Sequence, residues 1–320
     1  MIETVILKQD SGFVEKGQID LLSSWKDQDN ALVWINLTNP SSSEDELIAN
    51  SFGFNTLEMA DATRLRHPPK VEFFDDHFLV LLRTVDFTDI ENEIDYSQLA
   101  VFVSEHYIVT RKLNPHECVD DIWNSLLENE IDCLHGTSHI AYLISRRVAD
   151  QYFRILEMLE ERLEELENLL TTDLNDSHLA ELSKYNGVLR KIHRAMAYHK
   201  SIFNSLLHAS TNSFIKDNIH EFNDVYEHME RSESLSLMHQ QLTADLVNSY
   251  LSVTSHRVNK IVKTLTIFTV LFVPLAFITG LYGMNFEYIP ELRVKNGYFY
   301  VLGIMVLIEV ALITFLRKLK

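Results

Sequence analysis

Two long apolar runs close to the end of the chain constrain its fold most strongly. Residues 261–282 contain one charged side chain, Lys263, and residues 298–316 contain only Glu309. A helix that crosses a bilayer needs about 20 mostly apolar residues, and both runs have that length. A buried helical hairpin in a soluble domain is the alternative. Two such runs, each flanked by charged residues, favour instead two membrane spans, at residues 259–282 and 298–316.

Basic residues mark one side of this hairpin. The loop between the spans, residues 283–297, sets two glutamates against one arginine and one lysine, so it carries no basic excess. The basic residues gather instead before the first span and after the second, as Arg257, Lys260, Lys263, Arg317, Lys318 and Lys320. By the positive-inside rule both termini lie in the cytosol, and residues 317–320 form a basic cytosolic tail. We expect a multi-pass protein of the cell (inner) membrane.

The region ahead of the membrane, residues 136–258, has helical periodicity. Apolar residues recur every three or four positions over 140–170 and again over 182–203, which predicts two long amphipathic helices. A third such pattern begins near residue 222, and neither glycine nor proline interrupts it before the first span. We therefore predict one helix over 222–282, on the order of 90 Å long at 1.5 Å per residue. It would join a cytosolic stalk directly to the membrane.

The first 135 residues have a different pattern. Short β-rich runs alternate with turn-like residues at 31–36, 71–74, 78–82, 99–103 and 107–110, and helical pieces such as 44–51 interrupt them. This pattern predicts a cytosolic α/β domain over residues 1–135. The N-terminus has no basic region followed by an apolar core, so no signal peptide is expected there.

Composition excludes several classes of function. The formal net charge of −18 leaves no basic surface for nucleic acid but suits a protein that attracts cations. No defined zinc site is predicted from Cys118 and Cys133, or from the histidine pairs His135/His139 and His193/His199, because the two cysteines form no metal-binding pattern and neither histidine pair has cysteine or carboxylate ligands at the spacing of such a site. Most of the 14 histidines are expected at the surface. No nucleophile–base arrangement and no phosphate-binding loop are present, so we do not expect an enzyme.

Several stretches together resemble the CorA family of divalent metal-ion (magnesium/cobalt) transporters. They are RHPPKVEFF at 66–74, TLTIF at 264–268, FVPLAFITG at 272–280 and YGMNFEYIPEL at 282–292. The last of these falls in the loop between the two predicted spans. The resemblance covers most of the chain. It implies a funnel-shaped homopentamer in which the first span lines a central pore and the second lies outside it, against lipid.

The resemblance makes Gly283, Met284 and Asn285 the selectivity filter, with five Asn285 side chains around the entrance. Magnesium holds its octahedral water shell tightly. An amide oxygen accepts hydrogen bonds from that shell without the full charge that would trap the ion, and the carbonyl of Gly283 would add to it. Gly283 would also let the chain turn tightly where the helix stops. A simple helix C-cap is the alternative role for Asn285. In the same loop, Glu287 and Glu291 either concentrate cations or are inert solvated charges.

The predicted pore lining follows one stripe of the first span. Its members are small or hydroxylic residues and a few aliphatic ones: Asn259, Val262, Thr266, Thr269, Val273, Ala276 and Gly280. Leu265 lies beside the stripe and would form, with Val262 and Val273, a hydrophobic constriction that closes by dewetting. Val273 and Ala276 depart from the methionine and the hydroxyl that the family often places there. The alternative is that the stripe only packs helices together.

The family also implies a cytosolic magnesium sensor at subunit interfaces, where bridging ions hold the pore shut. The segment FNDVY at 222–226 matches the family segment with one such ligand, which makes Asp224 the candidate here. Its partner should lie just after the 79–83 strand, where Asp86 and Asp89 flank the matching position, Thr88. Solvated surface charge is the alternative for each.

Glu309 lies near the middle of the second span, where a carboxylate is costly and suggests function by default. We expect either a protonated side chain that bonds a neighbouring helix or a role in transport. For the whole chain we predict a channel for hydrated divalent cations, chiefly Mg²⁺ with Co²⁺ and Ni²⁺ as further candidates, and with the bilayer and other copies of itself as partners. The alternatives are a Zn²⁺ transporter of the ZntB type and a membrane-anchored coiled-coil scaffold without a pore.

Overall fold

The computed structural model describes residues 1–8, 13–26, 31–65, 67–86, 95–128, 136–172, 175–209, 218–285 and 289–318. The chain forms two compact units, Met1–Val247 and Asn248–Lys320. The boundary between them lies within a single helix, α8 (Ile219–Tyr282). The predicted helix over 222–282 is therefore confirmed, and it begins slightly earlier.

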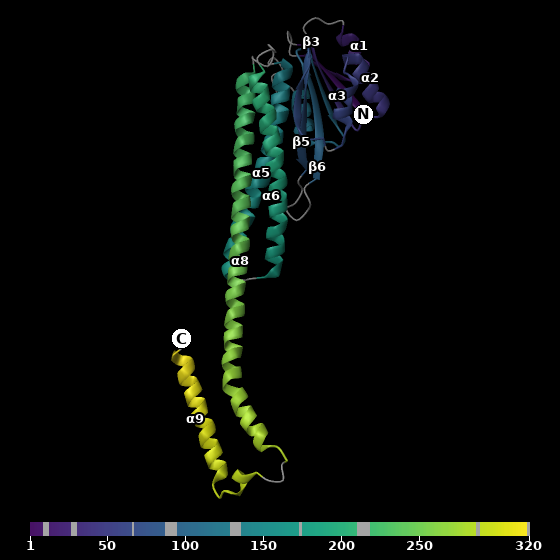
Figure 1. The fold of residues 1–320 in the computed structure, drawn as a ribbon. Helices are drawn as coiled ribbons and strands as arrows, with labels where there is room; N and C mark the ends of the chain where they lie inside the picture. Colours follow the sequence, from purple (N-terminus) through teal and green to yellow (C-terminus); the bar gives the residue numbers. More distant parts are fainter. Residues whose placement is uncertain are drawn as a thin grey trace. The chain divides into compact units, whose positions relative to one another are not determined.

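A seven-stranded mixed sheet organises the N-terminal unit (Figure 1). Its strands lie in the order β2-β1-β3-β7-β6-β5-β4, with β3 and β7 parallel and all other neighbours antiparallel. The bounds are β1 (Ile2–Lys8), β2 (Phe13–Gly17), β3 (Ala31–Thr38), β4 (Lys70–Phe73), β5 (His77–Asp86), β6 (Asp95–Ser104) and β7 (Tyr107–Lys112). The five predicted strands are all present, and β1 and β2 are additional.

Helices cover both faces of this sheet (Figure 1). On one side lie α1 (Leu21–Trp25), α2 (Ser42–Phe52) and α3 (Thr56–Thr63), and their apolar residues share a core with alternate strand residues such as Leu79, Leu81 and Phe102. A capping box of Ser41 and Glu44 begins α2. On the other side the sheet contacts α5 (Gly136–Thr172) and α6 (Asp176–His208), while α4 (Glu117–Leu127) packs on α5. Coverage on both faces explains why the strands are continuous apolar runs.

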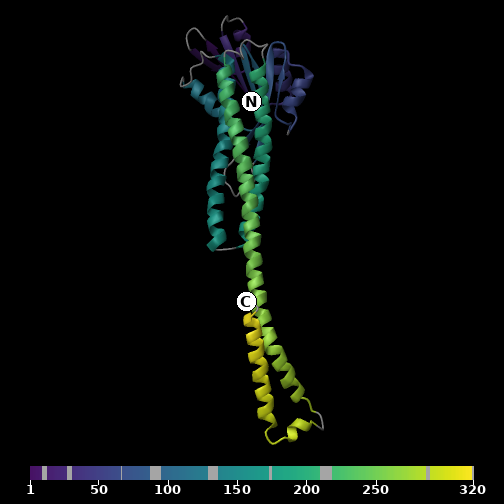
Figure 2. The same cartoon turned by 60° about the vertical axis from the view of Figure 1, so that its left-hand side comes forward.

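The long helices α5, α6 and the first part of α8 lie side by side in both views (Figures 1 and 2). Their contact positions follow the predicted three- and four-residue spacing on α5 and α6, where Ile144, Leu163 and Leu189 are fully buried. The apolar pattern expected to form the contact face of α8 includes Leu235 and Leu242, and these two side chains are only half-buried. The expectation is therefore only partly correct. The buried positions between Met229 and Leu246 are polar instead: Ser232, Ser236, His239 and Thr243.

Among the residues that the structure describes, four histidines are buried: His77, His116, His199 and His239. His199 has a clear structural role. Its Nε2 accepts a hydrogen bond from the backbone N–H of Arg83 at 3.0 Å, and the Tyr152 hydroxyl donates to the carbonyl of Arg83 at 3.0 Å. Burial, and secondly the charge of Arg83, lowers the pKa of His199 to about 3, so the ring stays neutral and accepts this bond. These contacts join α5 and α6 to β5.

The C-terminal unit consists of the rest of α8, the short 3₁₀ helix η2 (Pro290–Arg293) and α9 (Gly297–Lys318). Both α8 and α9 contain a segment long and apolar enough to cross a membrane. Their large side chains are exposed, with Phe272 at 61%, Phe277 at 69% and Leu307 at 70%. The helical hairpin of a soluble domain would bury these side chains, so the exposure favours the membrane alternative.

Candidate functional site

The segment Gly283-Met284-Asn285 follows directly on the end of α8. The N–H of Gly283 donates to the carbonyl of Thr279 at 3.0 Å, and the N–H of Met284 donates to that of Leu281 at 3.3 Å. The helical hydrogen bonding therefore ends through these two backbone groups. Asn285 lies beyond them with an exposed side chain. The backbone N–H groups of Gly283 and Met284 make these two bonds, and the C-cap role considered for Asn285 stays an alternative.

Gly283 lies in the turn that follows α8, and its backbone there is not left-handed. Among the described glycines, only Gly53 and Gly136 have a positive φ. A Cβ atom on Gly283 would instead lie 3.2 Å from the carbonyl oxygen of Thr279. The absence of a side chain here allows close backbone contact at the helix end.

The predicted pore stripe lies exposed on α8. Asn259, Val262, Leu265, Thr266, Thr269, Val273, Ala276 and Gly280 are all exposed, with Val262 at 53% and Leu265 at 64%. The hydroxyl groups of Thr266 and Thr269 donate within the helix, to the carbonyls of Val262 at 2.8 Å and Leu265 at 2.9 Å. Their oxygens keep free lone pairs on the exposed side.

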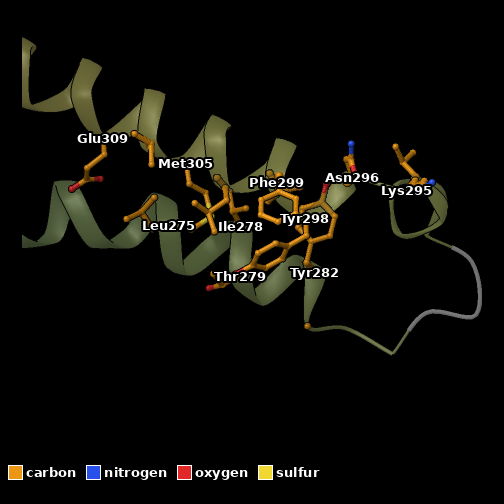
Figure 3. Close-up of a pocket in the computed structure, with 16 residues that line it drawn as sticks. Leu275, Ile278, Thr279, Tyr282, Lys295, Asn296, Tyr298, Phe299, Met305 and Glu309 are labelled. Carbon is orange, nitrogen blue, oxygen red and sulfur yellow. The ribbon is translucent and has the colours of Figure 1, made fainter.

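A different face of α8 meets α9. The pocket between the two helices is lined by Leu275, Ile278, Thr279 and Tyr282 of α8 and by the adjoining Gly283, and none of these residues belongs to the stripe (Figure 3). Contact with α9 therefore does not explain the stripe. Within the described chain, packing between helices leaves the stripe uncovered.

Glu309 lies at one end of this pocket, beyond Met305 and Leu275 (Figure 3). Its Oε2 atom is buried and has no hydrogen-bond partner among the described residues. Every other side chain that Figure 3 labels near it is apolar. The carboxyl group therefore faces α8, away from the predicted pore lining.

The outer-loop glutamates are incompletely described. Glu287 lies outside the described residues, and only the backbone of Glu291 is described, within η2. Their predicted attraction for cations stays a prediction.

Asp224 lies on α8 against α5. Arg146 of α5 donates through Nη1 to Oδ2 of Asp224 and through Nε to Oδ1 of Asp150, the latter at 3.2 Å. The Tyr142 hydroxyl also donates to Oδ2 of Asp224, at 3.4 Å. Burial, and secondly the charge of Asp224, raises the pKa of Tyr142, so this hydroxyl remains a donor. One turn away, His139 Nδ1 lies 2.7 Å from Glu221 Oε1.

The candidate partners of Asp224 are less well defined. Asp86 is the last residue of β5, with only its backbone described, and Asp89 lies outside the described residues. Within the described part of one chain, no three histidine, cysteine or acidic side chains come together to hold a metal ion. A regulatory ion at Asp224 would therefore need ligands from a second copy or from residues 87–94. No local sequence pattern points to Arg146, because its partner Asp224 is 78 residues away in the chain.

Comparisons with known proteins agree with this architecture. The family described as CorA-like Mg²⁺ transporter protein matches residues 29–318. The cobalt/magnesium transport protein CorA of Thermotoga maritima is 26% identical over 289 residues, which are 90% of this chain and 82% of that relative.

Two full-length solved structures share the fold. The CorA magnesium transporter of Methanocaldococcus jannaschii aligns with a TM-score of 0.81 at 21% identity, over 98% of this chain and 97% of that one. The full-length CmaX protein aligns with a TM-score of 0.84 at 18% identity, over 99% and 96% of the two chains. Since the family match begins just before β3 and spans the rest of the sheet domain, the long helices and both apolar segments, this chain belongs to the CorA-like family of divalent metal-ion transporters.

Proposed function

We propose that this chain forms a homopentameric membrane channel for hydrated divalent cations, chiefly Mg²⁺, with Co²⁺ and Ni²⁺ as further substrates. The observation that carries the proposal is the exposed Asn285, which follows the end of the apolar helix α8 in a loop that leads to a second apolar helix. Membership of a transporter family supports transport itself. The choice of ion rests on the chemistry of the amide group.

The entrance selects the ion through its water. Because Mg²⁺ gives up its water shell reluctantly, a filter works best by accepting hydrogen bonds from the shell. Five Asn285 side chains and the Gly283 carbonyls offer such acceptors without a formal charge. The ion then leaves readily, since no carboxylate of the filter holds it.

The path continues along the exposed stripe of α8. Asn259, Thr266 and Thr269 present oxygen atoms to a water-filled channel, while Val262, Leu265 and Val273 form the constriction that closes by dewetting. Glu309 of α9 lines the pocket between α8 and α9, so we place it outside this path. We propose that Glu309 is protonated and that its hydrogen-bond partner lies on a helix of another copy, since its Oε2 atom has none among the described residues.

The domains follow from this arrangement. Residues 1–135 and 136–258 lie in the cytosol as the α/β domain and the stalk, and the cell (inner) membrane holds residues 259–282 and 298–316. Residues 283–297 form the outer loop, where Glu287 and Glu291 attract cations, and residues 317–320 return to the cytosol. Asp224, with Asp86 or Asp89 of a neighbouring copy, senses cytosolic Mg²⁺ and keeps the pore closed while the ion is bound.

Uptake by proteoliposomes tests the proposal. We expect uptake of Mg²⁺, and also of Co²⁺ and Ni²⁺, that slows when Mg²⁺ is present on the side of the cytosolic domain. Protein-free liposomes are the control. Uptake of Zn²⁺ alone would identify a zinc transporter instead. No uptake of any of the four ions by correctly inserted protein would favour a scaffold without a pore.

A further inference from the structure

Arg146 holds together two carboxylates that come from two helices. Its Nε donates to Asp150 Oδ1 at 3.2 Å on its own helix α5, and its Nη1 donates to Asp224 Oδ2 on α8. The guanidinium therefore stands beside the carboxylate that we propose as a ligand of the regulatory cation. The chain supplies a positive charge of its own at this place.

The surroundings of this group are acidic and open to ions. The Asp224 and Asp150 side chains are each 40% exposed, and that of Arg146 is 29% exposed. The neighbouring Glu221 is engaged by His139 at 2.7 Å. Arg146 is consequently the cation that the described residues place on Asp224, while Tyr142 supplies only a neutral hydroxyl.

We infer that Arg146 competes with divalent cations for Asp224 and so sets the Mg²⁺ concentration at which the channel closes; this rests on the proposed regulatory role of Asp224. A divalent ion at Asp224 must displace the guanidinium or bind beside it. Displacement breaks a charge-assisted hydrogen bond, and binding beside it brings like charges together. Either way the apparent affinity for the ion falls.

If Arg146 had only a structural role, its loss would not change the binding of divalent cations. Ion pairs with this exposure contribute little to stability, so the loss of Arg146 should scarcely change unfolding. Its loss should, however, change ion binding. If the guanidinium charge and the bound divalent cation are about 5 Å apart in a medium with the permittivity of water, removal of the guanidinium charge strengthens cation binding roughly tenfold.

The test compares Arg146→Gln with Arg162→Gln in the full-length protein. Arg162 is a matched control because it lies on the same helix and also pairs with two carboxylates, Glu181 at 2.7 Å and Glu165 at 2.6 Å. The readouts are protection from proteolysis by Mg²⁺ in detergent, which reports binding, and inhibition of uptake by cytosolic-side Mg²⁺ in proteoliposomes. We expect a roughly tenfold lower half-effective Mg²⁺ concentration in Arg146→Gln, and no change in Arg162→Gln.

Two further variants separate the possible failures. Arg146→Lys keeps the charge and should behave like the wild type, and Asp224→Asn should remove most of the protection by Mg²⁺. If Asp224→Asn removes protection but Arg146→Gln leaves the half-effective concentration unchanged, the inference is overturned and the regulatory role of Asp224 stands. If Mg²⁺ protects the wild type and Asp224→Asn equally, both the sensor role of Asp224 and the inference fail.

Discussion

Replacement of Asn285 by alanine is expected to lower Mg²⁺ uptake by at least about tenfold, because each copy loses an amide that accepts hydrogen bonds from the ion's water shell. One such bond contributes on the order of 1 kcal/mol, and a ring of five loses several at once. A factor of ten in rate needs only about 1.4 kcal/mol. The measurement is the initial rate of uptake by proteoliposomes with equal amounts of inserted protein.

A second amide in the same loop provides the control. Asn296 has an exposed side chain, and its backbone carbonyl accepts from the N–H groups of Phe299 and Tyr300 where α9 begins, at 3.1 and 3.3 Å. Asn296→Ser removes this amide yet keeps a side chain suited to a helix start. It should leave uptake within about twofold of the wild type. If Asn285→Ala transported Mg²⁺ at the wild-type rate, the filter assignment would be wrong.

The largest effect on stability is expected from Asp45→Ala. Asp45 of α2 accepts two hydrogen bonds from Arg111 of β7, from Nε at 2.8 Å and from Nη2 at 2.9 Å, and these residues are 9% and 7% exposed. Without the carboxylate, the buried guanidinium keeps, among the described residues, its bond to the Ala62 carbonyl at 3.1 Å. Removal of one partner from a buried ion pair typically destabilises a protein by about 3–5 kcal/mol.

Urea unfolding of the full-length protein in detergent, followed by tryptophan fluorescence, measures this loss. All three tryptophans, Trp25, Trp34 and Trp123, lie in the N-terminal unit, so the signal reports on the sheet domain. The control is Glu46→Ala, which removes an exposed carboxylate from the next position of α2. If Asp45→Ala lowered the free energy of unfolding by less than about 1 kcal/mol, water would have to reach the guanidinium, and the ion pair would behave like one at the surface.

Local patterns carried enough information for the main elements of the fold. A run without glycine or proline from Phe222 to Leu271 predicts most of α8. Short apolar runs predict the central strands, because burial on both faces leaves a strand little room for polar residues. Of the missing elements, β2 lies at the edge of the sheet and α4 is short, whereas β1 is an inner strand of seven residues. The strand β2 at Phe13–Gly17 pairs only with β1, and α4 at Glu117–Leu127 has its apolar residues spread over one short face.

The polar contact face of α8 shows where sequence patterns mislead. Apolar anchors such as Phe222, Val225 and Leu246 fix the rotation of the helix at both ends of the bundle. Residues between them at the same helical phase are then buried whatever their chemistry, so Ser236 and Thr243 lie inside while Leu237 is 42% exposed. A pattern that counts only apolar residues follows the wrong face here.

The functional residues divide in the same way. The candidate Asn285 follows from the resemblance of its loop to the family, and the candidate stripe on α8 follows from helical spacing within one element. The contact between Arg146 and Asp224 does not, since it depends on how α5 and α8 are aligned in the bundle. Tertiary packing of this kind has no short-range signal in one sequence.

The central claim is that the entrance recognises a divalent cation together with its water shell. Cobalt(III) hexaammine tests it most directly, because this ion carries six tightly held ammonia ligands that donate hydrogen bonds outward as the bound water of Mg²⁺ does. It cannot shed these ligands to meet a protein oxygen. The account predicts that it inhibits Mg²⁺ uptake by the wild type in competition with Mg²⁺. Undiminished Mg²⁺ uptake at a large excess of the complex would contradict it.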